Sequence, residues 1–280
     1  MPLFARWIEP SLRKTDLVLR AIQKGLQYRE TILALAVRDM QARYAGTWGG
    51  AVWAIVHPIA IVGIFYVVFA IGFKAQGPSS TPFILWFVCG LVPWFYFSET
   101  LQAITNSVTS NPHLVKKTIF PTEILPAVHI ISGLLPHLIF IAILIGMLVY
   151  FEVPLSPSRL QFLYFFLCMS VLLIGFGWLL AALQVFYRDI SQGITIFLNM
   201  LFWATPIVWS KDILPGEYQA WLSYNPIFYI TNGYREMLIY PSAHWPSLRE
   251  TACFWALTLG VFVLGAYVFR RLKPEFADVL

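Results

Sequence analysis

The sequence is poor in charged residues and lacks the common motifs of nucleotide binding and hydrolysis. Lys, Arg, Asp and Glu make up 12% of its 280 residues, about half their share in soluble globular domains. The phosphate-binding loop Gly-x-x-x-x-Gly-Lys-Ser/Thr is absent, and so are the Gly-x-Ser-x-Gly turn, the His-Glu-x-x-His zinc motif and an EF-hand calcium loop. The chain therefore cannot cradle a nucleotide phosphate in the usual way, and nothing in it argues for a catalyst.

Metal-binding and disulfide patterns are also missing. Cys89, Cys168 and Cys253 lie inside apolar runs without a Cys-x-x-Cys spacing, so we expect small buried hydrophobes rather than ligands or bridges. Of the five histidines only His129 and His137 share a run, about two helical turns apart. Without an acidic partner nearby in sequence, they favour packing or hydrogen bonding over metal binding. We predict no metal site.

Long apolar runs are what the sequence has in abundance. Hydrophobic residues reach 59% and the mean hydropathy is +0.70. A helix needs about 20 mostly apolar residues to cross a bilayer core of about 30 Å. Six runs approach or exceed that length, which predicts an all-α membrane protein with six transmembrane helices: residues 49–73, 83–108, 124–151, 160–186, 190–209 and 251–269.

The basic residues divide unequally between the two sides of these six predicted spans. By the positive-inside rule the richer side is cytoplasmic, which places both termini in the cytoplasm. The net charge of +5 is then explained by topology and anionic headgroups, and we expect membrane lipids but no nucleic acid as partners. We divide the chain into an extension (1–28), a membrane domain (29–273) and a tail (274–280). Fourteen of 19 Lys and Arg lie on the richer side: Arg6, Arg13, Lys14, Arg20, Lys24, Arg29, Arg38, Arg43, Lys116, Lys117, Arg188, Arg270, Arg271 and Lys273.

Two segments outside the predicted spans carry helix signals. Residues 28–44 mix apolar and charged positions, which suits an amphipathic helix at the membrane interface; a basic flank that only sets topology is the alternative. After the second span, Asn111 and Pro112 are good helix starters and Pro121 ends the run. They predict a two-turn helix outside the membrane, with a plain linker as the alternative. Residues 187–189 predict a tight cytoplasmic turn.

The second span ends in a polar helical stripe. Glu99, Gln102, Thr105, Asn106 and Thr109 follow one another at intervals of one or three residues. Polar groups at membrane depth usually face protein or water. The alternative is that Glu99 has already reached the cytoplasmic headgroups, about 25 Å along the helix from Pro82, and both interpretations stay open at this stage.

The segment between the fifth and sixth spans is unlike a simple loop. Residues 226–239 form an apolar stretch of 14, too short to span and too apolar for solvent, so we predict short re-entrant or interfacial helices there, with a companion turn at 219–224. Aromatic residues reach 17%, and several of them lie in the middle of spans. Flat rings suit the C–H faces of sugars, so they favour a glycan channel; ordinary helix packing is the alternative.

Short segments in a fixed order along these spans resemble one known family. They comprise Arg38, Asp39, Arg43, Tyr44, Gly49, Trp53 and Pro58, then Gly90, Pro93, Trp94 and Phe97, then Phe120, Pro121, Glu123 and Pro126, then Tyr187, Arg188 and Asp189, then Thr205, Pro206, Ile207, Asn225 and Pro226. Together they resemble the membrane subunits of polysaccharide ABC exporters, the O-antigen, capsule and teichoic acid permeases (the Wzm, KpsM and TagG family). The N-terminal extension and His57 depart from the family's pattern.

The resemblance implies a type-2 ABC exporter fold in the bacterial inner membrane. It implies a homodimer with two copies of a separate ATPase, which would hold ATP and Mg, so that this chain carries no cofactor and is no enzyme itself. The substrate implied is a lipid-linked polysaccharide, O-antigen foremost. The roles assigned are ATPase contact for Arg38, Asp39, Arg43, His113, Lys116 and Lys117, channel lining for Phe65, Phe69, Trp94, Phe202 and Trp203, and outer gate for Tyr224, Asn225, Tyr229 and Arg235.

Other functions stay open on the sequence. An ABC exporter of a small lipid or drug differs only by its lower aromatic content. A membrane-embedded lipid-linked sugar transferase would need acids or histidines clustered at the interface, which the sequence lacks. A secondary transporter would need ionisable residues near the midplane and an internal repeat, which we do not find.

Overall fold

A computed structural model describes residues 25–44, 49–78, 81–116, 120–240 and 244–280. These residues are overwhelmingly helical and contain no β-strand, as the sequence predicts. The helices are α2 (Arg29–Tyr44), α3 (Trp53–Phe65, continued by a π-helical stretch Tyr66–Gly72), α4 (Phe83–Thr105), α5 (Pro112–Val115), α6 (Leu125–Ser132), α7 (Leu134–Tyr150), α8 (Phe162–Phe186), α9 (Ile190–Ala204), α10 (Gly216–Leu222), α11 (Pro226–Leu238), α12 (Leu248–Leu272) and α13 (Phe276–Val279).

Helix α4 is the centre of the bundle. It packs against α6, α7, α8, α9 and α11, and 78% of its most apolar stretch is buried, against 11% for the stretch from α3. Because α4 is surrounded by protein, its sequence is apolar on every side, as expected of a central helix. The apolar surfaces of α3 and α9 are instead largely exposed, and on α9 only Leu198 is buried.

Helices α8 and α12 form the most extensive helix pair, and glycines allow their close approach. A Cβ on Gly175 would come within 2.9 Å of the Phe262 backbone, and a Cβ on Gly265 would overlap the Gly175 carbonyl. Small residues at a crossing point let two backbones come together, which increases packing between helices in an apolar medium. Two glycines therefore fix where α8 and α12 cross.

Five of the predicted spans are long and apolar enough to cross a membrane among the described residues. The third is divided at Gly133 into α6 and α7. The fifth is shorter than predicted: α9 has 15 residues and ends at Ala204 rather than Trp209. Its end has a local cause, because Thr205 precedes Pro206 and takes an extended conformation with ψ of 135°.

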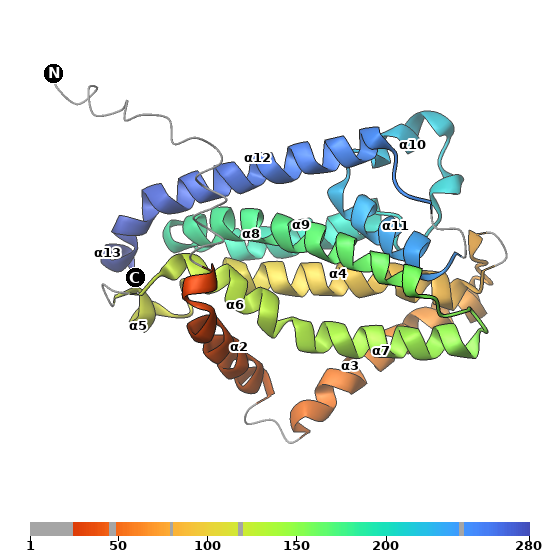
Figure 1. Ribbon diagram of the computed structural model, residues 1–280, viewed down its shortest axis with the longest axis horizontal. Helices are drawn as coiled ribbons and strands as arrows, with labels where there is room; N and C mark the ends of the chain where they lie inside the picture. Colours follow the sequence, from red (N-terminus) through yellow and green to blue (C-terminus); the bar gives the residue numbers. More distant parts are fainter. Residues whose placement is uncertain (1–24, 45–48, 79–80, 117–119, 241–243) are drawn as a thin grey trace.

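The short helices gather at opposite ends of the molecule (Figure 1). Helices α10 and α11 lie at one end, called here the α11 end, and α5 and α13 lie at the other, called the α5 end. The helix predicted at residues 28–44 is confirmed as α2, which packs on α6 with Ile32 and Ala36, whereas its apolar residues Leu33 and Val37 are exposed. The predicted two-turn helix after α4 has a single turn in its described part, since α5 ends at Val115 and residues 117–119 lie outside the described ranges. The tight turn between α8 and α9 is confirmed at residues 187–189.

Candidate functional site

The five aromatic residues predicted to line a channel lie in one chain of ring contacts. Phe65 and Phe69 stack one helical turn apart on the stretch that α3 begins, with centroids 5.9 Å apart. Phe65 meets Phe202 of α9 at 6.1 Å, and Phe202 meets Trp94 of α4 at 5.5 Å. Trp203 continues the chain 5.3 Å from Phe202. The structure thus brings together residues from three helices that the sequence assigned only by their place in the spans.

This aromatic chain runs from the interior of the bundle to its surface. Trp94 is buried, Phe65, Phe69 and Phe202 are half-buried, and Trp203 is 58% exposed. The rings therefore border the open face formed by α3 and α9. They pack against the core and also present flat apolar surface outside it, so the geometry is compatible with lining a path and with packing alike.

A polar network joins α4, α8 and α9 on the side of the aromatic chain toward the first turn of α9. Gln102 donates to Thr195, and Asn106 Nδ2 donates to Ser191 Oγ at 3.1 Å. Gln184 of α8 accepts from the Ser191 backbone N–H at 2.8 Å and donates to the Arg188 carbonyl at 3.1 Å. The network thereby ties the first turn of α9 to both neighbouring helices.

The polar stripe of the second span is thus divided between two environments. Gln102 and Asn106 face protein, whereas Glu99 is exposed. Thr105 bonds back to its own helix. The sequence analysis did not single out Gln184, although an amide near the end of an apolar run is a signal that could have identified it.

The N-cap residue of α11, Asn225, binds the segment that follows α9. Asn225 caps α11, because its side-chain oxygen accepts from the N–H of Ile227 at 2.9 Å and of Phe228 at 3.3 Å. The same side chain donates to Thr205 Oγ1 at 2.9 Å. One asparagine therefore starts the helix and holds it to the residue where α9 ends.

Arg235 makes a second attachment to the same segment. Its guanidinium donates to the carbonyls of Pro206 at 2.6 Å, Ile207 at 2.7 Å and Trp86 at 3.1 Å. It also lies over the Trp86 ring, 3.6 Å from the centroid, and the residue is 1% exposed. Among the described residues Arg235 takes part in no ion pair, so backbone carbonyls and an aromatic face stabilise this buried cation.

Gly90 makes room for this guanidinium. A Cβ at that position would overlap Arg235 Nη2 and lie 2.7 Å from Cζ. We call Asn225, Arg235 and the segment 205–207 the α11 clasp. Thr205, Pro206, Ile207 and Asn225 are among the residues that resemble the family. No local pattern could show that Asn225 and Arg235 both bind the segment 205–207.

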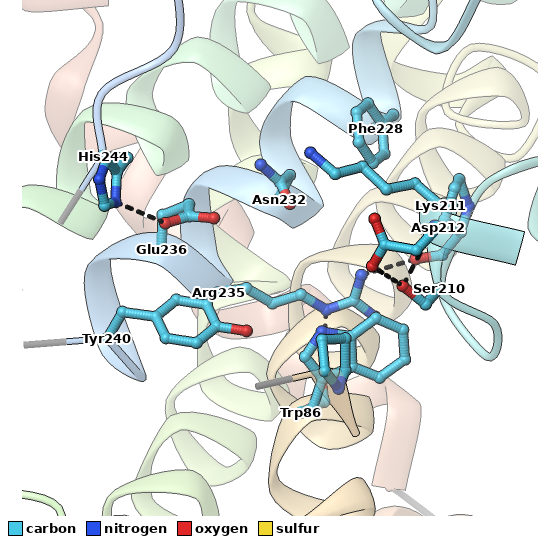
Figure 2. A pocket seen from close by; sticks show the side chains of 12 residues that line it. Trp86, Ser210, Lys211, Asp212, Phe228, Asn232, Arg235, Glu236, Tyr240 and His244 are labelled. Atoms are coloured by element: carbon cyan, nitrogen blue, oxygen red, sulfur yellow. Dashed lines mark hydrogen bonds and ion pairs between the residues drawn. The ribbon is translucent and has the colours of Figure 1, made fainter. Parts of the chain in front are cut away.

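A polar cleft of about 360 Å³ opens beside the α11 clasp (Figure 2). Asn232 and Glu236 lie one turn apart on α11, on the side from which Lys211 and Asp212 approach. Glu236 Oε2 lies 3.9 Å from His244 Nδ1, and Asp212 accepts from the Ser210 hydroxyl at 2.8 Å. The cleft therefore presents both signs of charge, and no cluster of three metal-ligating side chains occurs in the described ranges.

The two remaining predicted gate residues are Tyr224, which precedes α11, and Tyr229, which is part of it. Tyr224 is 57% exposed and accepts from Arg249 at 3.2 Å. Tyr229 is buried, and its hydroxyl lies 3.2 Å from the hydroxyls of Tyr164 and Thr251. The four predicted gate residues thus belong to one end of the molecule, two of them in the clasp.

At the α5 end, an ionic cluster holds α2 on α6. Asp39 accepts from Arg43 at 3.3 Å, and His129 Nδ1 lies 3.5 Å from the same carboxylate oxygen. Burial by itself would raise the pKa of Asp39, but hydrogen bonds to His129 and Ser132 and the charges of His129 and Arg43 outweigh it and lower that pKa below its usual value. Asp39 is therefore a charged group with partners, half-buried against the bundle.

The predicted ATPase-contact residues divide between partnered and exposed positions. Arg38, His113 and Lys116 are exposed. Asp39 and Arg43 belong to the ionic cluster with α6. Lys117 lies outside the described residues. The three exposed residues are accessible to another protein. The ionic cluster of Asp39 and Arg43 holds α2 on α6 and thereby positions Arg38, which also lies on α2.

The C-terminal segment closes the α5 end. Phe276 is fully buried, with ring contacts to Phe269 at 5.3 Å and Phe186 at 6.2 Å. Lys273 Nζ donates to Glu123 Oε2 at 2.8 Å, and the Glu123 carbonyl accepts from the Trp178 indole at 3.0 Å. The sequence analysis placed residues 274–280 outside the membrane domain as a tail, but these contacts dock them on it.

Comparisons with known proteins agree on one family. A family model described as ABC-2 type transporter matches residues 30–239. The O-antigen export system permease protein RfbA of Klebsiella pneumoniae is 23% identical over 252 residues, 90% of this chain and 95% of the relative. The Myxococcus xanthus protein of the same name is 22% identical over 269 residues, 93% and 99% of the two chains. The polysialic acid transport protein KpsM of Escherichia coli is 25% identical over 242 residues, 82% and 89%.

The family match includes all the aromatic residues of the chain described above, the polar network and the α11 clasp. It covers about three quarters of the sequence, and the relatives align over nearly their whole length. The match thus rests on the membrane bundle itself and not on an appended part. This chain belongs to the ABC-2 type transporter family.

Proposed function

We propose that this chain is the membrane subunit of an ATP-driven exporter that moves a lipid-linked polysaccharide, O-antigen foremost, across the bacterial inner membrane. The observation that carries the proposal is the near full-length similarity to proteins named as O-antigen and polysialic acid permeases. The aromatic chain supports it, since rings offer a sugar many weak contacts instead of one deep site.

In this proposal α9 also crosses the membrane, as the fifth of six transmembrane helices along the chain, and the functional unit is a homodimer. The 15 residues of α9 rise about 22 Å, most of the hydrocarbon thickness. The exposed apolar faces of α3 and α9 flank the aromatic chain, so two copies placed with these faces toward each other would enclose it. The α5 end is then the cytoplasmic end, as the distribution of basic residues predicts.

The two ends then have different tasks. At the α5 end, Arg38, His113 and Lys116 are exposed and available to two copies of a separate ATPase, which would hold ATP and Mg. At the α11 end, α10 and α11 would be short re-entrant helices that form the outer gate. The α11 clasp supports this assignment because it gives the gate a defined anchoring point on α9.

A deletion strain tests the function. Loss of this chain should abolish surface polysaccharide while the lipid-linked glycan accumulates inside the cell, and export should return only when chain and ATPase are expressed together. Unchanged surface polysaccharide, with a lipid or drug retained in the cell, would favour the small-substrate exporter instead. Accumulation of an unmodified lipid carrier without polymer would indicate the sugar transferase.

Substitutions test the channel and the ATPase contact separately. Replacing Phe69 and Trp203 together with Ala should reduce surface polysaccharide more than it reduces protein level. Tyr150→Ala is the control, because that ring is 79% exposed on α7, away from the aromatic chain. Lys116→Glu should weaken co-purification of the ATPase, with Lys74→Glu as the control. Normal export by the double variant would assign the rings to ordinary packing.

A further inference from the structure

An apolar groove lies on the side of the bundle, apart from the aromatic chain, the polar network and the α11 clasp. It has a volume of about 480 Å³ and lies between α2, α6, α8 and α12. Ile32, Ala127, Val171 and Leu259 contribute one wall each from these four helices. We call it the lateral groove. Two of its walls, α8 and α12, are long apolar helices, so the groove lies beside segments that can cross a bilayer.

The charge in the lateral groove is confined to one end. Glu123 and Arg270 are its charged lining residues, and both lie toward the α5 end. Glu123 is paired with Lys273 at 2.8 Å. Arg270 is half-buried and takes part in none of the ion pairs between described residues. The groove is thus apolar along its length and carries an uncompensated positive charge at its end.

The length of the lateral groove matches one leaflet of a bilayer. Trp255 and Arg270 both line it, and 15 residues of α12 separate them, a rise of about 22 Å. Half of a bilayer, headgroups included, is also about 20–22 Å thick. A linear hydrocarbon chain is slender enough to lie along such a groove, whereas a helix is about 10 Å across.

We propose that the lateral groove binds one anionic phospholipid of the cytoplasmic leaflet, with an acyl chain along the groove and the phosphate at Arg270. The placement of Arg270 in that leaflet rests on the topology given under the proposed function. Bound there, the lipid braces α2. Ile32 and Ala36 of α2 already pack with Ile124 and with Val128 of α6, and the acyl chain would connect α2 to α8 and α12 as well.

The test uses the purified full-length chain in detergent, stripped of lipid and titrated with phosphatidylglycerol or phosphatidylcholine. Native mass spectrometry counts the lipids retained. We expect one tightly held phosphatidylglycerol per chain, with a preference of about fivefold over phosphatidylcholine, since one basic residue near a membrane surface is worth about that factor. Arg270→Gln should remove the preference, and Arg271→Gln on the same helix should keep it.

A filled groove provides the second arm. Leu259→Trp should abolish the retained lipid, whereas Leu264→Trp should not, because Leu264 lies on the same helix with similar exposure (50% against 47%) but does not line the groove. If Leu259→Trp fails to fold, Ala127→Leu narrows the opposite wall instead. Equal lipid retention in the filled and control variants would overturn the proposal. So would displacement of phosphatidylglycerol by an equimolar polyprenyl phosphate, which would assign the groove to the substrate's lipid.

Discussion

The α11 clasp leads to a prediction about Gly90 that depends on Arg235. Gly90 lies inside α4, where alanine would ordinarily favour the helix by up to about 1 kcal/mol. The guanidinium of Arg235 occupies the space that a Cβ would need. We therefore expect Gly90→Ala to destabilise the protein when Arg235 is present and to be neutral or stabilising when Arg235 has been replaced by alanine.

The magnitude follows from the bonds that a displaced guanidinium would lose. The carbonyls of Pro206 and Ile207 lie outside helices, and each unsatisfied buried carbonyl costs about 1–3 kcal/mol. The contact with Trp86 contributes up to about 2 kcal/mol. Part of this is recovered because the cation is no longer desolvated. We expect Gly90→Ala to lower the free energy of unfolding by about 2–4 kcal/mol when Arg235 is present. The coupling energy between positions 90 and 235 should be of similar size.

The assay is a double-mutant cycle of thermal or denaturant stability in detergent. The proteins compared are the native chain, Gly90→Ala, Arg235→Ala and the double variant, with Gly146→Ala as the control because a Cβ there meets nothing within 4 Å. The reversal of sign between backgrounds is the diagnostic result. If Gly90→Ala costs as much without Arg235 as with it, the guanidinium is not what requires glycine, and the account of the clasp is wrong.

Three further predictions concern the rest of the fold. Gly265→Ala should destabilise the bundle by more than about 2 kcal/mol because its Cβ would overlap the Gly175 carbonyl; Gly260→Ala, open on the same helix, should not, and equal thermal stability of the two variants would contradict the crossing. Lys273→Ala should cost about 1 kcal/mol or less, because the bond to Glu123 is only partly buried, and should be seen as faster hydrogen exchange in residues 274–280. Asp39 has a lowered pKa, so its contribution to α2 docking is complete above about pH 4 and is lost only as the pH falls through the lowered value. At neutral pH, Asp39→Asn should therefore reduce the protection of α2 from protease, and the native chain should lose the protection that depends on the Asp39 charge only well below about pH 4.

Hydropathy and local signals sufficed for much of the fold. The amphipathic segment predicted at 28–44 is α2, and the apolar stretch at 226–239 is α11, begun by Asn225 as a cap. These succeed because a helix face, an N-cap and a proline at the first turn act over a few residues. The length of α9 was overestimated because the apolar composition continues past Ala204 whereas the helical backbone ends there. Pro206 forces Thr205 out of the helical conformation.

The site was predictable in kind but not in geometry. Mid-span aromatic residues could be identified from hydropathy, yet that Phe65, Trp94 and Phe202 form one chain depends on how α3, α4 and α9 are packed. Arg235 was assigned to a gate from its position near the end of an apolar stretch. That its partners are carbonyls 28 and 29 residues earlier in the chain is a tertiary fact with no local signal.

The attachments of α9 have a mechanical consequence. At its first turn Gln184 and Asn106 hold Ser191, and directly after its last residue, Ala204, the α11 clasp binds the chain at Thr205. A helix of 15 residues held firmly at both ends behaves as a stiff rod about 22 Å long. A displacement of the turn between α8 and α9 is therefore delivered to α11 with little loss, and the two ends of the molecule cannot shift independently. With one spin label at Arg188 and one at Tyr224, the distance between them should stay constant when either end of the molecule moves.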